Sequence, residues 1–221
     1  MKNKKIMIIA LVVLLVGAVA VATGLTAAYW VGAEGDSEIA PQTDTTDWNY
    51  WSKYFIYEAI KENNKTVGYK IVGFEGAVLE NVIIPRIARG GRLKNADGTY
   101  SEIVDTALVK IVGNSIFANT TDKAIPTSIT LPTTVAVEPG AFIGLVNLIS
   151  IKVVSVLDED NVRYDNSIEI GTMAFFGCDK VERFIAATGI QFTTDANESG
   201  MEFDALKTAT GLPADLTRSA S

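Results

Sequence analysis

The chain has 221 residues, of which 48% are hydrophobic, and its formal net charge is −7. This length suffices for one domain with its own core. The acidic balance argues against a nucleic-acid partner, because binding to a phosphate backbone depends on clustered lysine and arginine. Histidine, the commonest general base and metal ligand, is absent, and the single cysteine excludes an internal disulfide.

The first 28 residues have the composition of an export signal. Three lysines within the first five residues precede an uncharged apolar run over residues 6–22, and small residues follow it. A basic start, an apolar centre and a small-residue boundary are typical of a secretory signal peptide. The 17 residues of the apolar run also reach the short limit for a membrane span, so an N-terminal membrane anchor is the alternative. In both cases we expect the rest of the chain to lie outside the cytoplasm.

The boundary of this segment carries a motif of its own. The stretch GLTAAYW resembles the cleavage site of signal peptides that the SipW-type signal peptidase removes, although no acidic residue directly follows the aromatic pair. This resemblance places cleavage at Ala27 or Ala28. Loss of the three lysines would take the net charge from −7 to −10, three positive charges fewer. After Tyr29 and Trp30, residues 31–47 are mostly small, polar and acidic, which predicts a disordered acidic spacer over residues 29–47.

Ordered structure is expected to begin with the aromatic stretch WNYWSKY. Two runs, Lys53–Ile60 and Val67–Phe74, flank the segment KENNKT. Since Asn63 and Asn64 readily adopt turn conformations, this pattern predicts a β-hairpin. The aromatic residues before it could form a platform for a sugar, although covering the first strand pair is the simpler role.

The middle of the chain contains repeats. Three segments superimpose: IVGNSIFAN, AVEPGAFIGLVNLISIKV and IGTMAFFGCDKVERFIA. They align on Phe117, Phe142 and Phe175, and apolar residues recur 3, 6, 9 and 11 positions after each of the last two phenylalanines. Each unit combines a turn with a strand that cannot bury its own apolar side, so neighbouring units must stack. The three phenylalanines are the predicted structural anchors of this stacking.

Cys178 fills the position that Leu145 occupies one repeat earlier. The repeat places no basic side chain beside it, as a reactive thiolate would require. We therefore expect Cys178 to be a small buried hydrophobe and a structural anchor like the phenylalanines.

The repeats resemble the BspA-like leucine-rich repeat family, whose units run roughly Ile-Gly-x-x-Ala-Phe-x-Gly-Cys-x-x-Leu-x-x-Ile-x-Leu-Pro. The resemblance covers about Tyr54 to Ala187. Departures are the insert RLKNADGTYSE, the longer loop ANTTDKAIPT, and Glu138 where the family usually has glycine. The resemblance implies a right-handed solenoid on a bacterial surface, used in adhesion and protein binding.

The predicted fold class is therefore α+β: a short right-handed leucine-rich-repeat solenoid of about three to four repeats over residues 48–190, opened by an N-terminal β-hairpin cap. A C-terminal extension or tail would occupy residues 191–221. Four strands should lie side by side in one sheet, near Asn81–Pro85, Ser128–Pro132, Leu148–Val153 and Val181–Ala186.

These strands define the candidate binding face. Because side chains alternate along a strand, the residues between the apolar positions must project outward. The face combines hydroxyls, aliphatic side chains and two cations, which suits a surface protein or an anionic glycan. An inert solvated face is the simpler alternative. The predicted outward-facing residues are Asn81, Ile83, Ser128, Thr130, Ser150, Lys152, Arg183 and Ile185.

Signals for metal binding and catalysis are weak. The stretch DEDNVRYDN offers Asp158, Asp160 and Asp165 as Ca²⁺ ligands, but it lacks the glycine and distal glutamate of an EF-hand loop, which favours a solvated insert. We expect no cofactor. Nothing links serine and carboxylate residues into a catalytic motif, so we expect no enzyme, and a hydrolase without a recognisable motif is a remote alternative.

The predicted function is an exported, non-catalytic protein-binding or adhesion module of the bacterial cell surface. The alternative is a structural component of an extracellular matrix or filament, which the SipW-like signal suggests. The expected partner is a surface protein or glycan and not nucleic acid. Contact with a membrane is expected only through the N-terminal segment, if it is not cleaved.

Overall fold

The computed structural model describes residues 48–75, 80–103, 106–118, 126–155 and 166–220, all within one compact unit that spans Gln42–Ser221. The predicted export segment, its cleavage site, the acidic spacer and the calcium candidates Asp158, Asp160 and Asp165 lie outside the described residues. Within the described ranges, no helix is long and apolar enough to cross a membrane.

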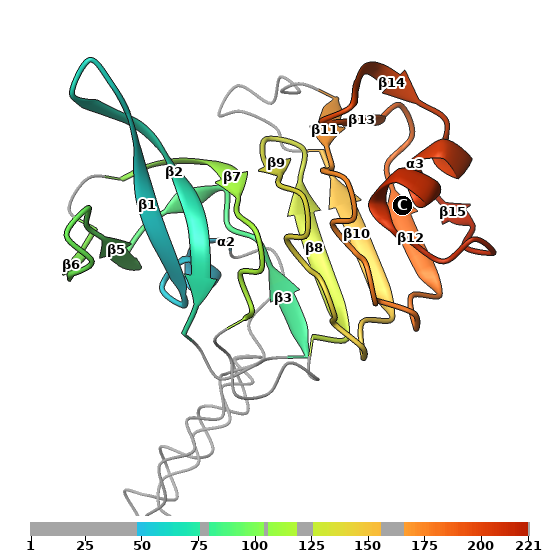
Figure 1. Cartoon of the computed structure of the whole chain (residues 1–221), viewed down its shortest axis with the longest axis horizontal. Coiled ribbons are helices and arrows are strands. Elements are labelled where there is room, and N and C mark those ends of the chain that lie inside the picture. Colours follow the sequence, from blue (N-terminus) through green and yellow to red (C-terminus); the bar gives the residue numbers. More distant parts are fainter. Residues whose placement is uncertain (1–47, 76–79, 104–105, 119–125, 156–165, 221) are drawn as a thin grey trace, which may run out of the picture. The chain divides into compact units, whose positions relative to one another are not determined.

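The N-terminal part of this unit is a mixed seven-stranded sheet (Figure 1). Strands β1 and β2 form the predicted hairpin, and Asn63 and Asn64 take left-handed φ angles of 49° and 66° in its turn. The segment after β3 (Asn81–Ile83) then pairs with this hairpin, because β5 runs parallel to β1 and β7 runs parallel to β2. The strands are β4 (Ile87–Ala88), β7 (Ala107–Val112), β2 (Lys65–Phe74), β1 (Phe55–Glu62), β5 (Arg92–Lys94) and β6 (Tyr100–Glu102) in this order, with β9 (Ala136–Val137) paired to β7.

A five-stranded parallel sheet follows (Figure 1). The four strands predicted to be neighbours are confirmed in that order, and a fifth strand from the chain's last residues extends the sheet. Alternate residues such as Ile129, Ile151 and Phe184 lie in register and are fully buried. The strands are β3 (Asn81–Ile83), β8 (Ser128–Pro132), β10 (Ser150–Val154), β12 (Arg183–Ala186) and β15 (Arg218–Ser219).

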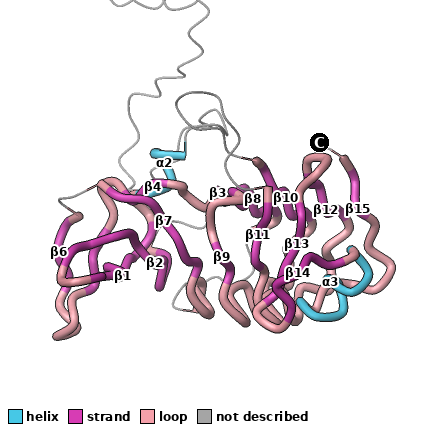
Figure 2. The backbone as a smooth tube through the Cα atoms, turned by 90° about the horizontal axis from the view of Figure 1, so that it is seen from above, coloured by secondary structure: helices cyan, strands magenta, loops and turns pink. Residues whose placement is uncertain are grey.

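A second row of strands lies across the core from this sheet (Figure 2). β9 pairs with β7, Val137 bridges to Ile170, and β11 (Ser167–Glu169) runs parallel to β13 (Gln191–Thr194). Strand β14 (Asn197–Met201) then turns back antiparallel to β13. The aliphatic and aromatic side chains of both rows form one continuous hydrophobic cluster.

The turns between the two rows stack through backbone hydrogen bonds. The amide of Phe142 donates to the carbonyl of Ala174 at 2.8 Å, and the amide of Phe175 donates to the carbonyl of Thr210 at 2.9 Å. The phenylalanine rings of successive turns are also neighbours. The centroids of Phe117 and Phe142 are 6.3 Å apart with the rings tilted, and those of Phe142 and Phe175 are 5.3 Å apart with the rings stacked. The predicted anchors therefore occupy equivalent, buried positions in successive turns.

The described part of the chain has two short helices, α2 (Trp48–Ser52) and α3 (Phe203–Thr210). Helix α3 ends at Gly211, whose φ of 77° lies in the left-handed region that favours glycine at this position. Leu206, Leu212 and Leu216 are buried in the same hydrophobic cluster as the strands. Residues 191–220 thus pack onto the core and supply β13, β14, α3 and β15.

The predicted α+β leucine-rich-repeat solenoid is wrong as a fold class. The unit consists mostly of mixed and parallel sheets that curl into a half-barrel, and it is not a clear solenoid. Two features cause the difference. The turns that carry Ala-Phe close by hydrogen bonds without forming helices, so helix content is low. The insert RLKNADGTYSE also forms strands β5 and β6. Strand β5 pairs with β1 of the hairpin, and β6 pairs with β5. The hairpin is therefore part of a large mixed sheet and not a separate cap.

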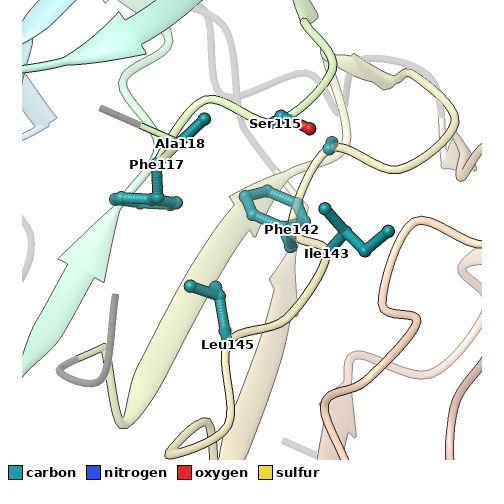
Figure 3. Close-up of a pocket in the computed structure, with 7 residues that line it drawn as sticks. Ser115, Phe117, Ala118, Phe142, Ile143 and Leu145 are labelled. Atoms are coloured by element: carbon teal, nitrogen blue, oxygen red, sulfur yellow. The ribbon is translucent and has the colours of Figure 1, made fainter. Parts of the chain in front are cut away.

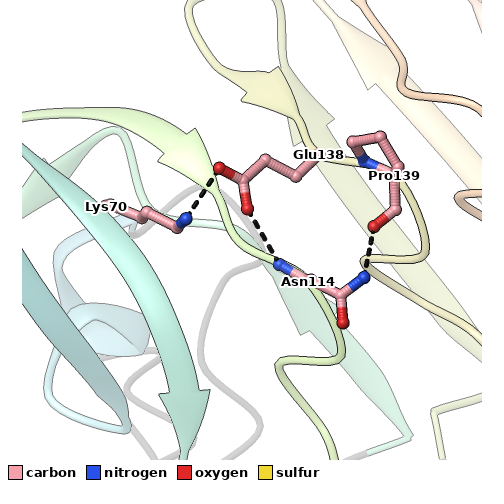
Figure 4. A network of polar contacts seen from close by, with 4 residues as sticks. All are labelled: Lys70, Asn114, Glu138 and Pro139. Atoms are coloured by element: carbon pink, nitrogen blue, oxygen red, sulfur yellow. Dashed lines mark hydrogen bonds and ion pairs between the residues drawn. The ribbon is translucent and has the colours of Figure 1, made fainter.

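Glu138, which stands where the other two repeats have Gly113 and Gly171, connects β2 to the turns (Figure 4). Its carboxylate accepts a hydrogen bond from the Lys70 ammonium at 2.7 Å and another from the Asn114 amide at 3.2 Å. The side-chain amide of Asn114 in turn donates to the carbonyl of Pro139 at 2.5 Å. The Glu138 side chain thereby links strand β2 of the hairpin to the turns that contain Asn114 and Glu138 itself.

Candidate functional site

The five-stranded sheet aligns all eight predicted binding residues in two rows. Parallel pairing in register aligns the first row across β3, β8, β10 and β12, and it aligns the second row two residues further along each strand. The first row is Asn81, Ser128, Ser150 and Arg183, and the second is Ile83, Thr130, Lys152 and Ile185.

Six of these eight side chains reach solvent. Asn81, Lys152 and Arg183 are exposed, whereas Ser128, Thr130 and Ile185 are half-buried. Ile83 and Ser150 are buried, with exposed fractions of 2% and 7%. Helix α2 contacts β3, which carries Ile83. Ser150 has a small side chain flanked in register by Ser128 and Arg183. Neither residue offers surface to a partner.

Lys152 and Arg183 give this face its positive charge. They stand on adjacent strands, because Ser150 pairs with Arg183 and Lys152 lies two residues beyond Ser150. Neither cation forms an ion pair with a carboxylate of the described residues. The face therefore presents two cations on a chain with more acidic than basic residues.

Strand β15 adds residues that the sequence did not reveal. Ser219 pairs in register with Ile185 and extends the second row by one hydroxyl. Its neighbour Arg218 donates a hydrogen bond to the carbonyl of Ala187 at 3.0 Å, and its guanidinium lies over the Phe192 ring. The stretch around these residues is short and polar, so no apolar alternation marked it as a strand.

Cys178 lies inside the core. Its thiol donates a hydrogen bond to the carbonyl of Phe142 at 3.2 Å. Burial raises the pKa of this thiol from 9.0 to about 11. A thiol of this kind stays protonated at neutral pH, and the thiolate is the nucleophilic form. The geometry suits packing and not nucleophilic catalysis.

A small cavity lies between two successive turns (Figure 3). Its volume is about 40 Å³, and its walls include the rings of Phe117 and Phe142 together with Leu145. Sites for small organic ligands usually measure about 300–1,000 Å³. This cavity has room for water-sized molecules only.

Two carboxylates with lowered pKa values have structural partners. Hydrogen bonds from the hydroxyl and amide of Thr172 lower the pKa of Asp195, and those of Thr99 lower the pKa of Asp97. Asp97 thus closes its own turn, whereas Asp195 links the segment after β13 to Thr172, 23 residues earlier. Within the described residues, no three cysteine, aspartate or glutamate side chains gather as a metal site.

The aromatic stretch before β1 packs largely inward. Trp51 is buried, and its ring contacts those of Tyr50 and Tyr54 edge to face. The ammonium of Lys53 lies 4.6 Å and 4.9 Å from the ring centroids of Tyr50 and Tyr54. Among the described side chains of this stretch, these contacts engage Tyr50, Trp51 and Tyr54 with one another and favour a packing role.

Comparison with known proteins gives one structural similarity. The chain is similar to the crystal structure of a leucine-rich cell surface protein from Faecalibacterium prausnitzii A2-165, with 16% sequence identity and a TM-score of 0.37. The match covers 75% of this chain and 41% of that one. No family model and no curated protein matches the chain.

Proposed function

We propose that this chain is an exported, non-catalytic module that binds a surface protein or an anionic glycan of a cell surface. The outer face of the five-stranded sheet is the binding surface. The observation that carries this proposal is the pair of exposed cations, Lys152 and Arg183, which stand on neighbouring strands without a described carboxylate partner.

The composition of the face supports a large partner. Half-buried hydroxyls and Ile185 surround the two cations, and they lie on strands whose opposite sides are fully buried. A rigid, extended face of this kind holds its polar groups at fixed spacings, which favours binding to a repeating or flat surface. Export rests on the basic and apolar N-terminal segment.

The test is capture of surface material by the exported protein. The double variant Lys152→Glu with Arg183→Glu should lower the affinity for an anionic partner about tenfold or more, because each reversal replaces attraction by repulsion. Binding by the unchanged protein should also weaken as salt concentration rises.

A matched control reverses two exposed lysines on the other sheet, Lys61→Glu in β1 and Lys110→Glu in β7. It changes the net charge by the same amount but leaves the outer face intact. Equal binding by the two folded double variants would place the binding surface elsewhere. Turnover of a substrate by the exported protein would contradict the non-catalytic role.

A further inference from the structure

A cluster of apolar side chains lies exposed on two neighbouring turns, away from the proposed binding face. We define the apolar turn patch as four large residues that are about half exposed: Ile143 (46%), Val146 (51%), Met173 (46%) and Phe176 (55%).

Backbone hydrogen bonds bring the two turns together. The amide of Gly144 donates to the carbonyl of Phe176 at 2.8 Å, which sets Ile143 and Phe176 on adjacent rungs of the stack. The turns approach closely because Gly177 lies against Gly144: a Cβ atom on Gly177 would meet the Gly144 Cα at 3.4 Å. The four side chains thus belong to one local surface.

Met173 is held in an unusual conformation. Its φ is 56°, in the left-handed region, and the equivalent residues of the two preceding turns are Gly140 (φ 68°) and Ser115 (φ 51°). A bulky residue rarely adopts this conformation, and such strained positions concentrate at functional sites. Methionine also adapts its shape readily at binding surfaces. At this turn, a strained backbone presents an apolar side chain to solvent.

We propose that the apolar turn patch is the contact surface between two copies of this chain. Half-exposed side chains of this size present roughly 400 Å² together, taking about 200 Å² for each fully exposed one. Apolar patches this large on a monomer are often interaction sites. A standard interface buries about 800 Å² per partner, of which somewhat over half is apolar. The patch therefore matches the apolar centre of a standard interface.

This surface lacks the like charges that would keep a second copy away. Acidic residues outnumber basic ones 26 to 19, so two copies repel each other over most of their surface. Residues 140–146 and 173–178 contain no charged side chain. At their rim, exposed Asp179 and Lys180 carry opposite charges. A two-fold contact can bring each of them near its opposite in the other copy, since an isologous interface uses the same surface twice.

The test is sedimentation velocity of the exported full chain over a wide range of concentrations. We expect the mass to rise from one copy to two. Phe176→Ser should raise the dissociation constant about tenfold or more, because aromatic residues dominate such contacts. Met173→Gly should also weaken the pair, while glycine keeps the left-handed turn as it does at Gly140. Leu108→Ser, which removes an exposed apolar side chain of β7, is the matched control and should leave the pair intact.

A single copy at every concentration would overturn this proposal. A pair that persists unchanged in both patch variants would equally do so, because another surface would then hold it. Growth into filaments would contradict a closed two-fold contact. Since the outer face of the sheet does not take part, loss of partner capture by the Lys152 and Arg183 variant leaves this result unaffected.

Discussion

The rings of Phe142 and Phe175 stack almost parallel, with an interplanar angle of 14° and centroids 5.3 Å apart. They belong to successive turns whose backbones are hydrogen-bonded to each other and to the end of α3. These ring contacts and hydrogen bonds therefore connect the middle of the chain to its C-terminal segment.

Truncating this stack should destabilise the whole unit. Phe175→Ala removes a fully buried ring and should lower the free energy of unfolding by about 3–5 kcal/mol. Phe176→Ala changes the next residue, which is 55% exposed, and should cost less than about 1 kcal/mol. Chemical denaturation of the two variants provides the comparison. Equal losses would mean that the stack carries little of the stability.

The thiol of Cys178 should make stability depend on alkaline pH. The unfolded thiol loses its proton near pH 9, whereas burial holds the folded thiol protonated until about pH 11. Its contribution is therefore complete below pH 9 and declines between pH 9 and 11, by about 1.4 kcal/mol per pH unit. The difference in unfolding free energy between the unchanged protein and Cys178→Ala should shrink over this range. A constant difference would show that the thiol is not buried.

The ion pair of Lys70 and Glu138 should contribute modestly, because both side chains are about one-third exposed. A double-mutant cycle with Lys70→Met and Glu138→Gln should give a coupling energy of about 0.5–1 kcal/mol. Glu138→Ala should lower the free energy of unfolding more than Lys70→Ala, since the Glu138 carboxylate also accepts a hydrogen bond from the backbone amide of Asn114. If Lys70→Ala were the costlier change, the link to the turns would be unimportant.

Lys207 should hold the last segment of the chain in place. Its buried ammonium donates to the carbonyls of Ala214 at 2.7 Å and Leu216 at 3.0 Å. Lys207→Met should cost about 1–3 kcal/mol and speed hydrogen exchange over residues 213–219, because it leaves the carbonyl of the buried Leu216 unpaired. The control is Asp204→Asn. Asp204 forms an ion pair with Lys207 at 2.8 Å, but its side chain is 91% exposed, so loss of this pair should change the free energy of unfolding little.

Four strands of the five-stranded sheet, β3, β8, β10 and β12, were predictable because apolar residues alternate along their sequences. The expected strand Ser128–Pro132 coincides with β8, and the hairpin formed where two asparagines allowed a tight turn. Identical offsets after Phe142 and Phe175 also fixed the register of β10 against β12. Short-range pattern and register therefore followed from the sequence.

The fold class could not be predicted from the sequence, because it depends on strand pairing between distant segments. Strands β5 and β6 are short and largely polar. They belong to a sheet only because β5 pairs with β1 and β6 pairs with β5. Likewise, alternation predicted Ile83 on the outer face, whereas Ile83 is buried in the hydrophobic cluster on a strand that α2 contacts. Strand β15 has two exposed residues and no apolar pattern at all.

That last strand limits how the sheet can grow. A parallel sheet normally ends in a row of free amides and carbonyls on which another chain can continue the pairing. Here the edge is two residues long and carries the charged Arg218, whose guanidinium is already engaged by Ala187 and Phe192. An incoming strand would find few free backbone groups there. The short β15 edge therefore limits extension of the five-stranded sheet from this side.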